Sequence, residues 1–331
     1  MAGRGGAHFT RPMKGSLTVP ASRPRRRSVP ALARALVAAL ATTLLAAPAA
    51  FDRYESPPAP EPPPAAGGSA TDARAAGAPA AGGPGAPVPY RHFLGRAFDT
   101  CEAPSLAVMR AWRASPYRAV GVYFGGRGRG CLTQKHLTPA WVTSAETLGW
   151  RLLPLFVGSQ APCVFAEHKK DVPIGSAPWE QGTKEAGEAV RAARALGIAA
   201  SSPLYLDMEA YRITDLRCAA TTLLFVRAWN REVRRLGYLP GFYSSADTGV
   251  RHMEQARKAG VKDLPSVMWF ARWQGAPALY AESVLHPLAW RERSRIHQYA
   301  GNVRESYGGQ SMLIDRNAVD APVAHVIAAR P

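Results

Sequence analysis

From Phe93 onward, short apolar runs alternate along the chain with longer segments whose apolar residues recur at helical spacing. The run at 151–157 shows the first kind well, because it is short and consists mostly of large aliphatic and aromatic residues. Such runs predict buried strands. We expect strands at 93–99, 119–124, 151–157, 203–208, 238–243 and 266–271, with weaker patterns at 296–299 and 312–315.

The segments between these runs predict helices. The clearest is 177–197, whose apolar residues share one face and whose last residue, Gly197, is a typical helix stop. Asp215 is placed to cap a second long helix, which Gly237 ends. Further helices are expected at 104–114, 138–148 and 246–259.

Repeated strand–helix units predict parallel strands joined by right-handed crossovers. About eight strands in roughly 240 residues fit an α/β protein with a single (β/α)8-type TIM barrel. The last third of this barrel is expected to be irregular, because no strong helices separate its strands. A doubly wound open sheet is the alternative, although no G-x-G-x-x-G follows a strand.

The first 90 residues differ from the rest. Arg25, Arg26 and Arg27 precede a 13-residue apolar stretch at 35–47, which ends at an Ala-Pro-Ala sequence. This order is typical of a cleavable signal peptide. The consecutive arginines fit twin-arginine export, although Pro30 stands where a large apolar residue is usual. An uncleaved anchor is the alternative, but the stretch is shorter than the ~20 apolar residues that a membrane span needs.

Residues 50–90 consist mainly of Pro, Ala and Gly and have few side chains that could form a core. They predict a disordered linker. The expected domains are therefore a signal peptide at 1–49, the linker at 50–90 and one folded domain at 91–331. The protein is expected to be secreted or associated with the cell envelope, with no stable membrane span after cleavage.

The net charge of +17 is uneven, since residues 1–50 contain eight Arg or Lys and no acid. Subtracting these eight from +17 leaves +9 for the remainder, so nearly half of the charge belongs to the leader. We therefore expect no nucleic-acid partner. A mild basic excess outside the cell is more consistent with an anionic envelope polymer, and we expect a monomer.

Two acids follow the expected strand at 203–208. Side chains alternate along a strand, so Asp207 and Glu209 point the same way and Met208 points the other way. In a TIM barrel the active site lies where the parallel strands end. Asp99 and Asp315 also follow expected strands, so a closed barrel would bring all four acids together, as carboxylate chemistry on a sugar requires.

Aromatic and amide side chains occupy comparable positions and could line a saccharide groove by stacking and hydrogen bonding. These candidates for substrate binding are Tyr123, Gln160, Tyr205, Tyr211, Tyr243, Trp269, Trp273 and Gln298. Each could instead belong to the core.

The four cysteines, Cys101, Cys131, Cys163 and Cys218, all lie in the expected folded domain and form no C-x-x-C. An even number in an exported chain favours two disulfides, with four free thiols as the alternative. Three pairings are possible. Each cysteine follows one of the first four strands, and neighbouring-strand geometry favours Cys101–Cys131 and Cys163–Cys218.

Other chemistries lack their motifs. There is no H-E-x-x-H, the eight histidines have no metal-ligand spacing, and no G-x-S-x-G provides a nucleophile. The Gly-Gly-Arg-Gly-Arg-Gly loop at 125–130 lacks the G-K-[ST] of a phosphate loop and is expected to be a turn with exposed arginines. We expect no cofactor and no metal.

Several segments together resemble the actinobacterial glycoside-hydrolase-like domain of unknown function 1906, over roughly residues 93–320. They are Asp99-Thr-Cys-Glu-Ala-Pro-Ser105, Met109-Arg-Ala-Trp112, Tyr123-Phe-Gly-Gly126, Val157-Gly-Ser-Gln-Ala-Pro-Cys163, Tyr205-Leu-Asp-Met-Glu-Ala-Tyr211, Gly241-Phe-Tyr-Ser-Ser245 and Trp269-Phe-Ala-Arg-Trp273. That family is similar to the family 25 glycoside hydrolases, which are lysozyme-like barrels that cut peptidoglycan.

The resemblance implies Glu209 as general acid and Asp207 as nucleophile or as the group that orients a substrate acetamido. Asp99 and Asp315 would be electrostatic supports. Two hypotheses follow: an exported glycosidase acting on peptidoglycan or an envelope polysaccharide, or a non-catalytic glycan-binding protein on the same barrel.

Overall fold

The computed structural model describes residues 90–273 and 275–327. The expected signal peptide and linker, up to residue 89, lie outside the described residues. Over the two described ranges, no helix combines the length and the apolar character that crossing a membrane requires.

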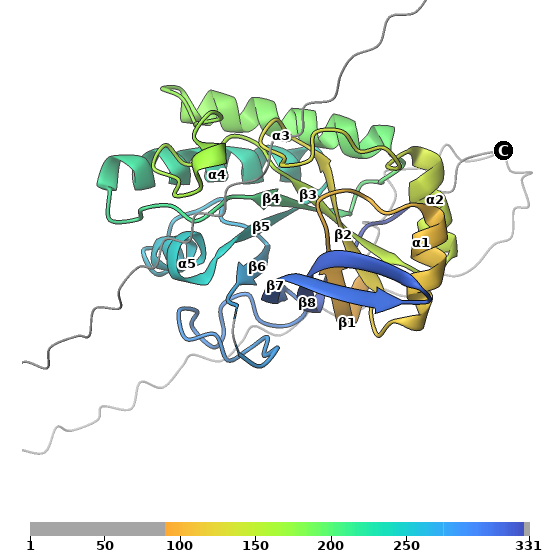
Figure 1. The fold of residues 1–331 in the computed structure, drawn as a ribbon. Coiled ribbons are helices and arrows are strands. Elements are labelled where there is room, and N and C mark those ends of the chain that lie inside the picture. The colour runs from red at the N-terminus through yellow and green to blue at the C-terminus, as the bar shows by residue number, and fades with distance from the viewer. Residues whose placement is uncertain (1–89, 274, 328–331) are drawn as a thin grey trace, which may run out of the picture. The chain divides into compact units, whose positions relative to one another are not determined.

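In this part of the chain, eight strands close into a barrel in sequence order (Figure 1). Neighbouring strands from β1 to β7 are parallel. The closed sheet confirms the expected barrel and excludes the doubly wound alternative. The strands are β1 (His92–Asp99), β2 (Ala119–Gly125), β3 (Arg151–Phe156), β4 (Pro203–Asp207), β5 (Leu239–Ser245), β6 (Val267–Ala271), β7 (Arg295–Tyr307) and β8 (Gln310–Pro322).

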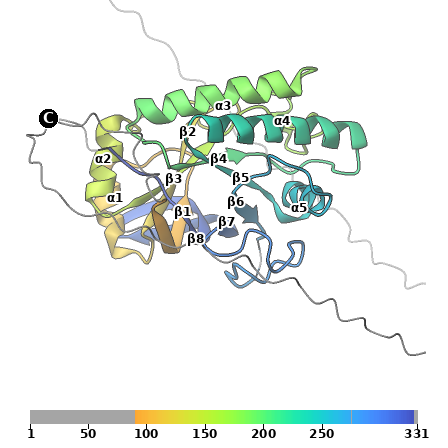
Figure 2. The same cartoon turned by 180° about the vertical axis from the view of Figure 1, so that it is seen from behind.

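Helices surround the barrel, and α3 and α4 lie side by side along it in both views (Figures 1 and 2). Their starts follow from the sequence: the side chains of Ser105, Thr138 and Asp215 accept hydrogen bonds from backbone N–H groups in the first turns of α1, α2 and α4. The helices are α1 (Leu106–Ala111), α2 (Pro139–Thr147), α3 (Pro178–Ala195), α4 (Leu216–Arg235) and α5 (Arg251–Lys258), with short helical turns η1 (Trp112–Ala114), η2 (Glu167–Lys169) and η3 (Ala246–Val250).

The last strand departs from the expected pattern. β8 is antiparallel to both β7 and β1, so the eighth strand–helix unit is replaced by a hairpin. Gly308 and Gly309 form its turn with φ values of +56° and +75°, a conformation that side chains with a Cβ rarely adopt. The hairpin extends beyond the barrel and reaches η1, where Trp112 Nε1 donates to the carbonyl of Gln310 over 2.9 Å.

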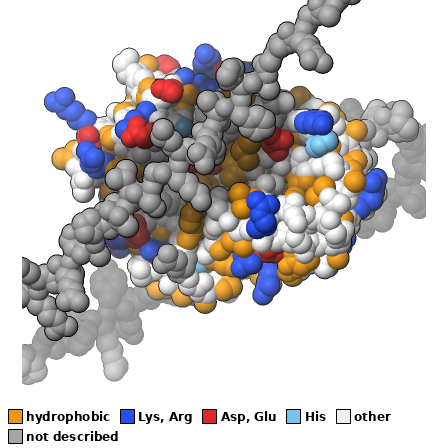
Figure 3. Space-filling view, viewed as in Figure 1, with side chains coloured by type: hydrophobic (Ala, Val, Ile, Leu, Met, Phe, Trp, Pro, Cys, Tyr) orange, Lys and Arg blue, Asp and Glu red, His pale blue; other side chains and the backbone are white. Residues whose placement is uncertain are grey.

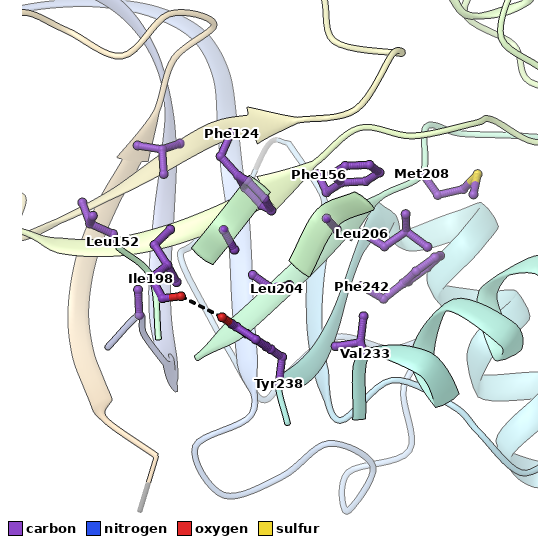
Figure 4. Packing of buried hydrophobic residues seen from close by; sticks show 14 of the residues in the cluster. Phe124, Leu152, Phe156, Ile198, Leu204, Leu206, Met208, Val233, Tyr238 and Phe242 are labelled. Carbon is purple, nitrogen blue, oxygen red and sulfur yellow. Dashed lines mark hydrogen bonds between the residues drawn. The ribbon is translucent and has the colours of Figure 1, made fainter. Parts of the chain in front are cut away.

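Strand residues alternate between two apolar layers. Side chains such as Leu204, Leu206 and Phe242 point outward and pack beneath the helices (Figure 4). In the same layer the hydroxyl of Tyr238 donates to the carbonyl of Ile198 over 2.8 Å (Figure 4). The inner layer fills the barrel and consists of Ala97, Ala119, Leu153, Leu155, Tyr205, Leu239, Val267, Trp269, Ile296, Val319, Ala321 and Val323. The barrel is thus a packed core that is closed below the candidate site.

Both expected disulfides are present. The Cys101–Cys131 bond joins Cα atoms 5.7 Å apart, and the Cys163–Cys218 bond joins Cα atoms 6.0 Å apart. No free cysteine remains in the described part of the chain. On the face shown in Figure 3, the visible Lys and Arg side chains are scattered among other side chains.

Candidate active site

The inner face of the barrel changes from apolar to polar at one level. Asp99 comes two residues after the inward Ala97, and Asp207 comes two residues after the inward Tyr205, so both point into the barrel mouth. A cavity of about 370 Å³ opens at this level. All four expected acids line it: Asp99, Asp207, Glu209 and Asp315.

Asp99 is almost fully buried and is surrounded by hydrogen-bond donors. The Tyr123 hydroxyl donates to Oδ2 over 2.7 Å, Asn317 Nδ2 donates to Oδ1 over 2.7 Å, and Gln298 Nε2 donates to Oδ1 over 3.2 Å. Burial, with a contribution from Asp315, nevertheless raises the pKa of Asp99 to about 7. Asp99 therefore loses or gains its proton near neutral pH.

Asp207 is the last residue of β4 and is 3% exposed. Among the described residues, none forms a hydrogen bond with its Oδ1 atom. Burial raises the pKa of Asp207 well above its usual value; Glu209 adds to this rise, and Lys169 opposes it. Burial therefore favours the protonated form of the Asp207 carboxyl, and this form can donate a hydrogen bond.

Glu209 lies beyond the end of β4, and the Gln160 side chain holds the backbone there. Gln160 Nε2 donates to the Asp207 carbonyl over 2.9 Å, and Gln160 Oε1 accepts from the Glu209 N–H over 2.8 Å. The Glu209 side chain is 34% exposed, and its Oε1 lies 3.7 Å from Lys169 Nζ. Met208, between the two acids, points into the outer core as its strand position predicts.

Asp315 reaches the cavity from the hairpin strand β8. The Asn302 N–H donates to Asp315 Oδ1 over 2.6 Å, and Gln298 Nε2 donates to Oδ2 over 3.4 Å. Burial raises the pKa of Asp315, the Asn302 N–H opposes this rise, and Glu209 adds to it. Three of the four acids therefore favour the neutral form more than a free carboxyl does.

A second cavity of about 360 Å³ adjoins the first at Glu209, which lines both. Tyr243, Arg272 and Trp273 contribute to its wall. The Tyr243 hydroxyl and Trp273 Nε1 both donate to Gln298 Oε1, each over 3.0 Å. Of the expected substrate-binding residues, Tyr123 thus lines the first cavity, and Tyr243 and Trp273 line the second.

The remaining expected contacts need correction. Tyr205, Tyr211 and Trp269 are fully buried and line neither cavity. Tyr205 occupies the layer below Asp207 and donates to the Pro322 carbonyl, while Tyr211 bonds to His252. Gln160 and Gln298 are also buried, and their amides hold site residues in place.

Four residues that the sequence analysis did not select also shape the site: Arg129, Lys169, Asn302 and Asn317. Arg129 lines the first cavity, and its guanidinium bonds to the carbonyls of Gly126 and Tyr123, which corrects the expectation of an exposed arginine. Lys169 is 5% exposed and donates to the Gly128 carbonyl over 2.6 Å. Asn317 lies two residues after Asp315 on β8, so both side chains point to the same face of the strand. This spacing could have identified Asn317 from the sequence.

The described residues contain no group of three or more His, Cys, Asp and Glu side chains arranged to hold a metal ion. The chemistry that the site supports with its own side chains is proton transfer by carboxyl groups of unequal exposure.

The model of the family described as "Rv2525c-like, glycoside hydrolase-like domain" matches residues 110–319, which is more than half of the chain. The chain belongs to this family. No curated protein matches it.

Similar solved structures include the Tat-secreted protein Rv2525c of Mycobacterium tuberculosis in complex with L-tartrate, at 16% identity and a TM-score of 0.49, covering 70% of this chain and 99% of that one. The catalytic domain of the endolysin ply40 from bacteriophage P40 of Listeria monocytogenes has 15% identity and a TM-score of 0.41, covering 69% and 94%. The modular autolysin LytC from Streptococcus pneumoniae has 14% identity and a TM-score of 0.40, covering 70% and 46%.

Proposed function

We propose that this protein is an exported glycosidase that hydrolyses a cell-envelope glycan, either peptidoglycan or a polysaccharide. The observation that carries the proposal is the convergence of Asp99, Asp207, Glu209 and Asp315 on one cavity at the barrel mouth. Membership of a glycoside hydrolase-like family supports a sugar as the ligand. Export is supported by the predicted signal peptide and by two disulfides, which persist in oxidising compartments.

In this proposal Glu209 gives a proton to the glycosidic oxygen. Its position supports the role, because its side chain is 34% exposed and lies where the two cavities meet, so a bond between two sugar units can pass beside it. A sugar that fills both cavities excludes water from the Glu209 carboxyl.

Asp207 is the residue that orients the sugar. Burial favours the protonated carboxyl, which is a poor nucleophile but can donate a hydrogen bond, and Asp207 lines the first cavity, where a sugar would accept that bond. Of the two roles that the resemblance implies for Asp207, this observation favours orientation of a substrate acetamido over nucleophilic attack. Asp99 and Asp315 would support positive charge at the anomeric carbon in their ionised forms.

The test is release of reducing ends from purified peptidoglycan, chitin and envelope polysaccharide, with Glu209→Gln and Asp207→Asn beside the wild type. We expect at least about a hundredfold loss in Glu209→Gln on natural substrates. An aryl glycoside with an activated leaving group needs no proton, so it should restore much of the loss in Glu209→Gln. Glu167→Gln, an exposed acid on η2, is the control. Full activity of Glu209→Gln on a natural glycan would refute its role as proton donor.

A non-catalytic glycan-binding protein is the second candidate, and one contact favours it. The Glu209 Oε1 atom lies 3.7 Å from Lys169 Nζ, so the side chain assigned as proton donor already takes part in an ion pair. This candidate predicts glycan binding without reducing-end release, and binding that survives Glu209→Gln. Detectable turnover by the wild type that Glu209→Gln abolishes would exclude it.

A further inference from the structure

We propose that the second cavity is a subsite for an uncharged sugar unit with Trp273 as its stacking platform. The substrate is then a neutral glycan chain that places a sugar on each side of Glu209, the residue common to both cavities. This inference rests on the proposed function only in taking a glycan as the ligand, and it does not require that the glycan be cleaved.

Trp273 has the properties of a fixed aromatic platform. Its side chain is 48% exposed, yet its Nε1 is anchored to Gln298 Oε1 over 3.0 Å. The ring lies so close to the backbone at Gly301 that a Cβ added there would be 2.0 Å from Trp273 Cζ2. The indole is therefore held by the backbone at Gly301 and by its N–H, while about half of the residue remains exposed and contributes to the wall of the second cavity. A large, flat aromatic surface can stack on the apolar face of a sugar ring. Because the Trp273 side chain is already fixed, little conformational entropy is lost when a sugar binds.

The charged groups of this cavity are already paired. Arg272 donates to both carboxylate oxygens of Asp247, each over 2.9 Å, and its other face bonds to Glu282 over 2.6 and 2.9 Å. Arg251 adds a further hydrogen bond to Asp247 over 3.0 Å. The guanidinium thus has no free face for a uronate, a phosphate or a sulfate. Burying an unpaired ligand charge here would be costly, so the cavity selects a neutral unit.

The platform is also connected to the acids of the first cavity. Gln298 Oε1 accepts from Trp273 and from Tyr243, while Gln298 Nε2 donates to Asp99 and Asp315. One buried amide therefore joins the wall of the second cavity to two carboxyls of the first. Gln298 is a positioning residue. It fixes the walls of the two cavities relative to each other, so that one continuous glycan chain can occupy both.

The experiment measures dissociation constants of the full chain for N-acetylglucosamine and its tetramer, and for an oligogalacturonate of equal length. All variants carry Glu209→Gln, so that turnover does not alter the ligand. We expect Trp273→Ala to weaken tetramer binding about tenfold, with a much smaller effect on the monomer. Trp273→Phe should keep most of the tetramer affinity. Trp179→Ala removes a half-buried Trp of α3 that lines neither cavity, and it should change neither constant.

The inference is overturned if Trp273→Ala binds the tetramer as tightly as Trp179→Ala does, if the oligogalacturonate binds more tightly than the tetramer, or if no neutral oligomer binds. If Trp273→Ala does not fold, Trp273→Leu keeps apolar bulk against Gly301 without the flat ring and should show the same loss. Binding that depends on Trp273 in a protein that releases no reducing ends would leave this inference standing and refute the glycosidase proposal alone.

Discussion

Asp99 and Asp315 lie opposite each other in the antiparallel β1–β8 register and share the side-chain amide of Gln298. Two carboxyls that approach so closely in a buried setting disfavour a second negative charge, which is one reason why the pKa of Asp99 rises to about 7. The pair links the stability of the barrel to pH.

The first prediction concerns that link. Because the pKa of Asp99 is about 7 in the folded chain and 3.8 in the reference state, the folded form binds the proton more tightly in this interval. The unfolding free energy should therefore fall as pH rises from about 4 to about 7. Asp99→Asn should reduce the difference in unfolding free energy between about pH 4 and about pH 8 by roughly 4 kcal/mol, measured by urea denaturation.

Asp171→Asn provides the matched control, since Asp171 is exposed and should leave this pH dependence unchanged. Asp99→Asn also disturbs the hydrogen bonds from Tyr123, Asn317 and Gln298, which will lower the unfolding free energy at every pH. Only the change of the unfolding free energy with pH therefore tests the prediction. An unchanged slope would contradict a buried, neutral Asp99.

The second prediction concerns Lys169, whose ammonium lowers the pKa of Asp207. Lys169→Met removes this charge and keeps the length of the side chain. Asp207 should then hold its proton to higher pH, which should shift the basic limb of kcat/KM upward by up to about 1 pH unit. Lys170→Met, which affects only an exposed pair with Glu167, should leave the profile in place. An upward shift of the acidic limb, in place of the basic one, would show that ionised Asp207 is the active form.

The third prediction concerns Gln160, which bridges the Asp207 carbonyl and the Glu209 N–H. Gln160→Ala leaves both buried backbone groups without a partner and should cost about 2–3 kcal/mol in denaturant unfolding. It should also lower kcat, because the acids lose their fixed spacing. Gln181→Ala removes a comparable bridge, between Gly175 and Ser159, and should lower stability with little effect on kcat. Equal losses of kcat in both variants would refute a specific positioning role.

The fourth prediction separates the two disulfides. Each closes a loop, of 30 and 55 residues, and removing either should cost about 2–4 kcal/mol. Only Cys101 and Cys131 line the first cavity, next to the loop that carries Arg129. The double variant Cys101→Ala/Cys131→Ala should therefore weaken glycan binding, whereas Cys163→Ala/Cys218→Ala should not. Isothermal titration under conditions where both variants are folded distinguishes the two cases.

Much of the barrel was predictable because its first six strands and their helices follow local rules. The expected strand at 203–208 corresponds to β4 at Pro203–Asp207, and the expected cap at Asp215 is present. Alternation along β4 also predicted correctly that Asp207 and Glu209 would reach one cavity with Met208 opposite. Periodicity and capping are short-range properties, so the sequence reveals them directly.

The last third could not be predicted in the same way. The expected strands at 296–299 and 312–315 are fragments of β7 and β8, which together form a long hairpin. Gly308-Gly309 between alternating residues is a hairpin signal, and it was the feature that could have revealed the antiparallel strand. Asp315 therefore reaches the site from the middle of a reversed strand, not from the end of a parallel one.

Whether an inward-pointing aromatic side chain reaches a cavity depends on its level along the barrel axis. Tyr205 points the same way as Asp207, but it lies one layer lower, where Gly241 leaves room for its ring. Sequence alternation gives the direction of a side chain and not the level at which the packed core ends. Lys169 is the last residue of η2, a helical turn too short to show periodicity, so only the folded chain places it beside Glu209.

The reversed course of β8 has a consequence for how the domain can be attached. His92 pairs with Pro322 at one end of the β1–β8 ladder, and Asp99 pairs with Asp315 at the other. Both ends of the folded unit thus leave from the base of the barrel, away from the two cavities. A tether at either end would leave the cavities facing outward. A domain fixed in this way could reach a polymer too large to diffuse, because the ends of the folded unit and the two cavities lie at opposite poles of the barrel.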